Sequence, residues 1–198
     1  MIRCCIHVFV AYRGVHYALA FVLCLVPSFY GGPVEGAGIE VLYAPDDAPL
    51  DRLVTLYQQA KRYIYVSVYG LTYPHAVKAL VAAKKRGVDV RMLTDQERTQ
   101  EFKQHSALHT LQLAGIPIRV NQHEGLMHLK QVVIDDEINT SGSMNHTTSG
   151  NLYNDERMDI ITDRVLSQKA RDHFLSMWND QTRFVEWNEA EHAGYGKR

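Results

Sequence analysis

The sequence predicts an α/β fold in which a mixed β-sheet carries helices on both of its faces. In the first half, short segments rich in β-branched and aromatic residues alternate with amphipathic segments of helical period. In the second half, shorter strand-like segments follow one another and lead into one long amphipathic segment. The alternating pattern is typical of strand–helix–strand units with right-handed crossovers, and the second pattern makes the sheet mixed.

Proline and glycine mark the ends of the elements expected in the first half. Strands are expected at residues 39–43, 63–69, 88–94 and 116–120, and helices start near Pro49, near Pro74 and at residue 102. Proline suits the first position of a helix, where its missing N–H would have no partner anyway. Gly87 and Gly115 are natural C-caps. Pro117 places the strand that follows near an edge of the sheet, or marks the start of that strand.

The second half is expected to contain strands at 126–134, 137–141 and 157–162 and a final helix at 164–178. His128 and Lys130 are two positions apart on the first of these strands. Their side chains should therefore leave the same face, about 6.6 Å apart along the strand.

Length and charge limit the classes of protein that the chain can represent. It has 198 residues, of which 46% are hydrophobic, and its formal net charge is −1. These values exclude collagen and low-complexity chains, and they argue against a polycation that coats nucleic acid by charge alone. We place one folded domain at 39–185 and a C-terminal tail at 186–198. The three cysteines all lie in the first 24 residues, so this domain is indifferent to the redox state of its compartment.

Residues 1–38 differ from the rest of the chain. Arg3 and Arg13 precede ten consecutive apolar residues at 17–26, and Pro27 and a glycine-rich stretch follow. A basic start, a short apolar core and small residues after it are typical of a secretory signal. Ten residues are too few to cross about 30 Å of hydrocarbon as a helix. We therefore expect a periplasmic or secreted protein. If the apolar segment is taken to be longer, with Pro27 interrupting it, an uncleaved membrane anchor is the alternative.

Polar residues that suit phosphate chemistry cluster in one segment. Lys130 can neutralise a phosphate oxygen while His128 attacks phosphorus or protonates a leaving oxygen. Ser143 and Asn145 can donate to phosphate oxygens. Gly142 allows close approach of the backbone. On the next strand, Glu156 could hold Nδ1 of a histidine and fix its tautomer.

Other polar and aromatic residues have simpler explanations. His105 and His109 are four apart on a helix and could face one ion, but the sequence offers no third ligand, so no metal site is expected. Tyr63, Tyr65 and Tyr69 share one parity of a strand, which favours packing in the core over stacking on bases.

The chain resembles the phospholipase D superfamily at these residues. The family pattern H-x-K-x4-D-x6-G-S-x-N fits His128, Lys130, Asp135, Gly142, Ser143 and Asn145 without a gap. Glu156 stands where the small bacterial endonucleases of the family and the related mitochondrial cardiolipin hydrolase carry glutamate. His146 departs from the pattern, because an aromatic residue is commoner there.

The resemblance implies a mechanism and an assembly. The family hydrolyses phosphodiesters through a covalent phosphohistidine without a metal or other cofactor, and it uses two copies of the motif. This chain has one copy, which implies a homodimer with a shared active site, where His128 of one subunit attacks and His128 of the other is the acid. Lys130 and Asn145 of both subunits would bind phosphate, and Asp135 would be structural.

Three functions stay open at this point. The first is a non-specific endonuclease that cleaves DNA, with RNA as a further substrate. The near-neutral net charge argues slightly against this function, because binding to a duplex prefers a basic surface. The second is a phospholipase D or cardiolipin hydrolase acting on phospholipid headgroups, weakened by the lack of a long apolar loop near the motif. The third is a non-catalytic nucleic-acid-binding module, and the intact His, Lys, Asn and Glu set argues against it.

Overall fold

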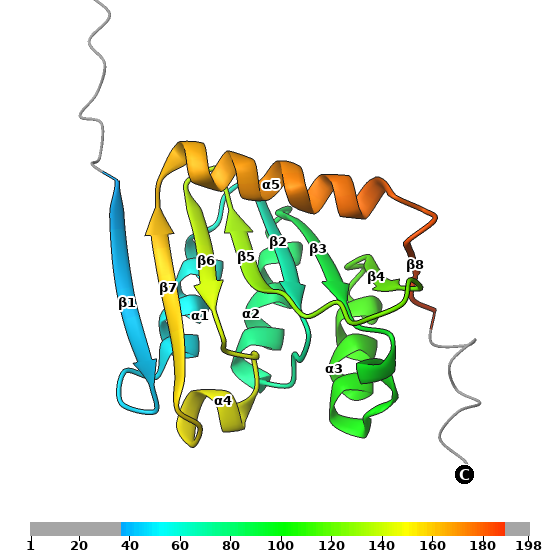
Figure 1. Cartoon of the computed structure of the whole chain (residues 1–198), viewed down its shortest axis with the longest axis horizontal. Coiled ribbons are helices and arrows are strands. Elements are labelled where there is room, and N and C mark those ends of the chain that lie inside the picture. Colours follow the sequence, from blue (N-terminus) through cyan, green and yellow to red (C-terminus); the bar gives the residue numbers. More distant parts are fainter. Residues whose placement is uncertain (1–36, 189–198) are drawn as a thin grey trace, which may run out of the picture. The chain divides into compact units, whose positions relative to one another are not determined.

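The centre of the protein is one sheet of eight strands, seen in a computed structural model that describes residues 37–188. The strands are β1 (Gly38–Ala44), β2 (Tyr63–Val68), β3 (Asp89–Thr94), β4 (Ile118–Asn121), β5 (Lys130–Ile134), β6 (Ile138–Gly142), β7 (Glu156–Thr162) and β8 (Phe184–Glu186). They lie in the order β1-β7-β6-β5-β2-β3-β4-β8 (Figure 1). Strands β2, β3 and β4 are parallel, and every other neighbouring pair is antiparallel.

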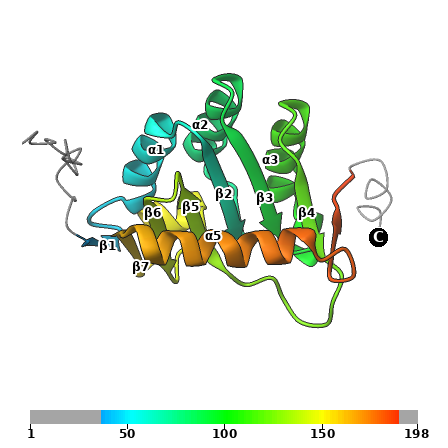
Figure 2. The same cartoon turned by 90° about the horizontal axis from the view of Figure 1, so that it is seen from above.

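Helices cover both faces of this sheet. On one face lie α1 (Pro49–Gln59), α2 (Pro74–Lys85) and α3 (Phe102–Leu113), and α5 (Arg164–Asn179) crosses the other (Figure 2). Two short helical segments lie in loops: the 3-10 turn η1 (Glu97–Gln100) and α4 (Thr148–Leu152). The predicted α/β fold with a mixed sheet and helices on both faces is therefore confirmed.

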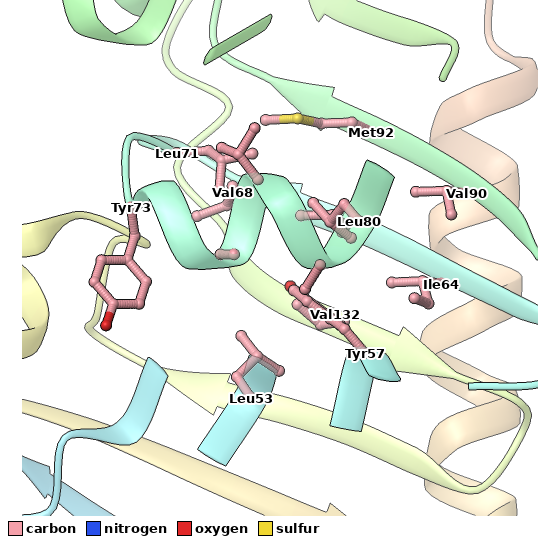
Figure 3. Packing of buried hydrophobic residues seen from close by; sticks show 14 of the residues in the cluster. Leu53, Tyr57, Ile64, Val68, Leu71, Tyr73, Leu80, Val90, Met92 and Val132 are labelled. Atoms are coloured by element: carbon pink, nitrogen blue, oxygen red, sulfur yellow. The ribbon is translucent and has the colours of Figure 1, made fainter. Parts of the chain in front are cut away.

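Each helical layer packs on its own hydrophobic core. Under α1 and α2, Leu53, Tyr57 and Leu80 meet Ile64 and Val132 of the sheet, and all five side chains are at most 1% exposed (Figure 3). Under α5, aromatic rings form a stack. Tyr63 lies 4.4 Å from Tyr65, and Tyr65 lies 4.7 Å from Phe174, between ring centroids. The expectation that Tyr63 and Tyr65 belong to the core is therefore confirmed.

One edge of the sheet, where several strands begin or end, collects most of the candidate site residues. The parallel strands β2 and β3 end there, as does β6, and β5 and β7 begin there (Figure 1). Loops that leave or enter these strands are thus brought together, although they are far apart in the sequence. His128 lies in the loop before β5, Lys130 begins β5, and Ser143 and Asn145 lie in the loop between β6 and β7.

The structure corrects one predicted strand. The strand expected at 126–134 begins only at Lys130, so His128 lies in the extended loop before β5. A side chain holds the beginning of this loop: the Asp95 carboxylate accepts a 2.8 Å hydrogen bond from the backbone N–H of the buried Met127.

Strand β8 and the helical segments η1 and α4 were not expected from the sequence. Because β8 runs to Glu186 and Trp187 is 1% exposed, the folded part continues two residues beyond the boundary expected at 185.

Two regions that the sequence singled out lie outside the described residues. They are the signal or anchor, described only from residue 37, and the tail beyond residue 188. Within 37–188, no helix has the length and apolar character needed to cross a bilayer.

Candidate active site

His128 and Lys130 lie side by side at the sheet edge. His128 Nδ1 is 2.8 Å from Lys130 Nζ, and the ammonium group also donates to the His128 carbonyl at 2.8 Å. The intervening Leu129 carbonyl accepts a 3.0 Å bond from the backbone N–H of Tyr69, which fixes the loop against the end of β2. The His128 side chain is exposed, so a substrate can reach it.

Partial burial changes the ionisation of Lys130. Removal from water disfavours the ammonium form and lowers the pKa of Lys130, while the nearby negative charge of Glu156 opposes that shift. Lys130 is thus a less strongly hydrated cation than a surface lysine, which favours its contact with an anion.

The turn after β6 depends on Gly142. Its φ is +148°, and a Cβ at this position would lie 2.1 Å from the Arg157 carbonyl oxygen. Any other residue would collide with the backbone of β7, so only glycine allows this turn. The backbone N–H of Ser143 then donates to the same carbonyl at 3.1 Å.

The side-chain amide of Asn145 is oriented so that its NH2 group is free to donate a hydrogen bond. Its Oδ1 accepts a 3.1 Å hydrogen bond from the backbone N–H of Gly70. A backbone N–H can only donate, so the oxygen must face it and the amide NH2 must face the other way. Asn145 and Glu156 line the same groove, and the amide NH2 can donate to an anion bound there.

Glu156 contacts a different partner from the one expected. Its carboxylate accepts a hydrogen bond from the Ser143 hydroxyl, while Nδ1 of His128 lies against Lys130. In this arrangement Ser143 is turned toward Glu156.

Asp135 lies at the opposite end of β5 from this cluster. Its carboxylate accepts hydrogen bonds of 2.7, 2.8 and 2.9 Å from the backbone N–H groups of Lys61, Arg62 and Tyr63. It therefore joins the turn after β5 to the loop before β2. The structure brings His128, Lys130, Ser143, Asn145 and Glu156 to one edge, and Asp135 holds the other.

Tyr69 is a site residue that the sequence analysis assigned to the core. Its ring centroid lies 4.9 Å from that of His128, 5.5 Å from Lys130 Nζ and 5.4 Å from the guanidinium carbon of Arg98. Tyr69 shares the parity of Tyr63 and Tyr65, but β2 ends at Val68. A position just past a strand end, at the edge where parallel strands finish, is the signal that could have found it.

The buried residue His146 connects the loop after β6 to the loop after β2 through its backbone. It is 0% exposed, its N–H donates to the Gly70 carbonyl at 2.8 Å, and its carbonyl accepts from Thr72 and Tyr73 at 2.9 Å each. Burial disfavours the charged imidazolium and lowers the pKa of His146 to about 4. Neither ring nitrogen has a hydrogen-bond partner among the described residues.

Comparison with known proteins places this arrangement in a family. The family described as "Cardiolipin synthase, PLD-like domain" matches residues 53–178. The chain is 29% identical over 168 residues to a mitochondrial cardiolipin hydrolase of Xenopus tropicalis, covering 85% of this chain and 77% of that protein. It is 33% identical over 118 residues to a phospholipase D of Rickettsia felis, covering 60% and 58%.

A solved structure agrees with this placement. The chain is similar to Nuc from Salmonella typhimurium, a phospholipase D family member, with a TM-score of 0.72 and 27% identity over 77% of this chain and 99% of that one. NucT from Helicobacter pylori has the same fold, with a TM-score of 0.67 and 18% identity. The chain therefore belongs to the phospholipase D family of phosphodiesterases.

Proposed function

We propose that this protein hydrolyses phosphodiesters without a metal, through a covalent phosphohistidine on His128, and that its substrate is nucleic acid. The observation that carries the proposal is the meeting of His128, Lys130 and Asn145 at one open edge of the sheet. These three side chains supply a nucleophile, a cation and a neutral donor, the groups that displacement at phosphorus needs.

The reaction has two steps. In the first, Nε2 of His128 attacks phosphorus, the P–O bond to the leaving group breaks, and a general acid protonates the departing oxygen. Lys130 Nζ and the Asn145 amide hold the non-bridging oxygens, where negative charge develops. In the second, water attacks phosphorus, the P–N bond breaks, and the group that acted as acid takes the proton from water.

The proton on His128 must change place before attack. A charged Lys130 can only donate to Nδ1, which leaves the proton of a neutral imidazole on Nε2. Attack through Nε2 requires the other tautomer, with Nδ1–H donating to an acceptor. We propose that phosphate draws Lys130 away from the ring and that Glu156, whose charge already acts on Lys130, accepts Nδ1–H.

A second copy of the chain is proposed to supply the acid. One chain offers one His128, and the histidine nearest to the site in sequence, His146, is fully buried and cannot reach a leaving group. A two-fold axis through the site would place a second His128 opposite the first. In this homodimer each His128 would serve as nucleophile for one substrate orientation.

Phospholipid headgroups are the second candidate substrate. Leu126 and Leu129 on the loop that carries His128 are 48% and 37% exposed, and such residues can enter a lipid surface. The names of the relatives from Xenopus and Rickettsia also favour this candidate. Nucleic acid is favoured here because the site opens into a groove that carries three basic side chains.

The experiment uses the full chain with chelator present. It is incubated with plasmid DNA, with single-stranded DNA and with cardiolipin vesicles, and bis(p-nitrophenyl) phosphate reports the chemistry independently of the substrate class. We expect cleavage of DNA and of the small diester, an acid-labile label on His128, and loss of both activities in His128→Ala. Turnover of lipid alone selects the second candidate, whereas no turnover of any diester refutes the enzyme and favours a binding module.

A further inference from the structure

A groove of about 690 Å3 leads away from the proposed active site, between the beginnings of α2 and α3. Asn145 and Glu156 of the proposed site line it. It is also lined by Lys78 of α2, by Arg98 of η1, and by Phe102 and Lys103 at the start of α3. The groove is therefore continuous with the site and carries more cations than the site itself.

Arg98 lies at the junction of site and groove. A methyl group on Gly70 would lie 3.5 Å from both Arg98 Nε and Asn145 Cγ, so these two atoms lie close together on either side of Gly70. Arg98 can therefore reach a phosphate next to one that Asn145 holds.

The guanidinium of Arg98 is held by two contacts, and one of its N–H donors has no partner within residues 37–188. It pairs with Glu101 and lies over the Tyr69 ring at 5.4 Å. Its buried Nε has no hydrogen-bond partner among the described residues. A buried donor without a partner is costly, and a bound acceptor would remove that cost.

The residues that α2 and α3 contribute to the groove include one exposed aromatic ring and two lysines without an ion-pair partner among residues 37–188. Phe102 is 87% exposed although it begins a helix that packs on the sheet. Lys78 and Lys103 are exposed, and neither forms an ion pair with a carboxylate of residues 37–188. The Glu156 carboxylate that faces the groove is bonded to Ser143, and Glu101 to Arg98.

We infer that this groove binds the single-stranded part of a polynucleotide next to the bond that is cut. Arg98 contacts the neighbouring phosphate, Phe102 stacks on an unpaired base, and Lys78 and Lys103 follow the backbone outward. The inference rests on the proposed phosphodiesterase function, to which it adds the preferred substrate class.

A single strand fits this groove better than a duplex does. Bases of a duplex are stacked inside it and cannot present a face to Phe102, whereas an unpaired base can turn onto the ring. Stacking and backbone neutralisation together are the usual way in which proteins hold single strands without reading their sequence. A lipid headgroup could bind the cationic side chains of the site and groove, but it would leave Phe102 on the groove wall without a stacking partner.

Binding tests the groove separately from catalysis. In the full chain carrying His128→Ala, fluorescence anisotropy measures the Kd for a short labelled oligothymidylate and for a duplex of the same length. Phe102→Ala should weaken binding of the single strand roughly tenfold. Lys78→Gln and Lys103→Gln should each lower the slope of log K against log salt by about 0.7.

Two exposed residues outside the groove provide matched controls. Leu113→Ala removes an exposed apolar side chain at the other end of α3, and Lys85→Gln removes a lysine at the other end of α2. Both should leave the Kd of the single strand unchanged. Equal effects of Phe102→Ala and Leu113→Ala, or an equal loss for single strand and duplex, would overturn the inference.

Turnover distinguishes failure of the groove from failure of the proposed function. With active His128, Phe102→Ala should lower the ratio of single-strand cleavage to bis(p-nitrophenyl) phosphate cleavage roughly tenfold. Absence of diester turnover in the unmutated chain refutes the proposed function, while the binding series still decides the groove. An unchanged ratio, or weaker binding to cardiolipin vesicles in Phe102→Ala with oligothymidylate binding intact, refutes the groove.

Discussion

A single missing side chain at Gly142 sets the geometry of the proposed site. Gly142→Ala would place Cβ 2.1 Å from a carbonyl of β7 at a φ of +148°, so β6 and β7 must separate. We expect a loss of about 3 kcal/mol or more in the free energy of unfolding. Chemical denaturation followed by circular dichroism measures it.

Gly87→Ala is the matched control for this substitution. Its φ is +92°, but nothing lies within 4 Å of the new Cβ, so only backbone strain of about 1 kcal/mol is expected. Similar losses for the two variants would contradict the steric explanation.

The buried imidazole of His146 should make the protein sensitive to acid. Its pKa is about 4 in the folded protein and near 6.5 when the chain unfolds. Between these values the unfolded chain binds a proton that the folded chain excludes, so stability is lost as the pH falls through this window. We expect His146 to contribute about 2 to 3 kcal/mol of this loss between pH 7 and pH 4.

Replacement by phenylalanine isolates that contribution. His146→Phe has no titrating group, so its unfolding free energy should fall less steeply between pH 7 and pH 4. Denaturant titrations at several pH values measure both curves. Parallel curves for the two proteins would show that His146 is not the titrating group.

Sequence reasoning identified the motif residues but not their neighbours. His128, Lys130, Ser143, Asn145 and Glu156 follow from a pattern of fixed spacing, which is local information. The ring of Tyr69, in contrast, belongs to the site only because β2 ends beside the loop before β5. Arg98 approaches Asn145 through a gap above Gly70, which no pattern along the chain records.

At the scale of elements, the turn between β5 and β6 is tied to the loop between α1 and β2 by one carboxylate. Asp135 has a φ of 56° and serves three backbone N–H groups. Asp135→Asn keeps a residue that tolerates this φ and loses one acceptor, so we expect a loss of about 1 kcal/mol. Asp135→Ala loses every acceptor and should cost about 3 kcal/mol.

Amide exchange locates the effect. In Asp135→Ala, the N–H groups of Lys61, Arg62 and Tyr63 should exchange faster, while those of β7 should not change. Diester turnover should fall much less than in Lys130→Ala, because Asp135 lies at the far end of β5. Loss of turnover with the fold intact would instead give Asp135 a part in the chemistry.

The long elements could be predicted and the short ones could not. Helix α2 begins at Pro74 and ends before Gly87, as the sequence indicated, because proline and glycine act locally. Strand β8 has three residues and exists because β4 offers it an unpaired edge. The strand expected from residue 126 starts four residues later, because the side chain of Asp95 satisfies the backbone of Met127.

At the scale of the whole molecule, the number of His128 side chains per site can be counted by mixing. If each site needs His128 from two chains, a hybrid dimer with His128→Ala has no complete site. Unfolding and refolding an equal mixture should then leave about a quarter of the unmutated activity rather than about half. Turnover of bis(p-nitrophenyl) phosphate measures this.

A variant with an unchanged site gives the reference for that mixture. Leu113→Ala mixed in the same way should keep nearly full activity, because its exposed side chain lies outside the site. Sedimentation should show a dimer in both cases. An active monomer would assign the acid to another residue of the same chain.

Both tryptophans lie near the C-terminal end of the folded part, so their fluorescence reports on that region alone. Trp178 is 8% exposed on α5 and contacts the guanidinium groups of Arg91 and Arg119, and Trp187 is 1% exposed just after β8. All tryptophan emission therefore originates where the final helix and strand close over the sheet. A red shift that precedes the loss of helical signal on heating would mean that this closing segment detaches first, while the edge with the proposed site, on the other strands, is still assembled.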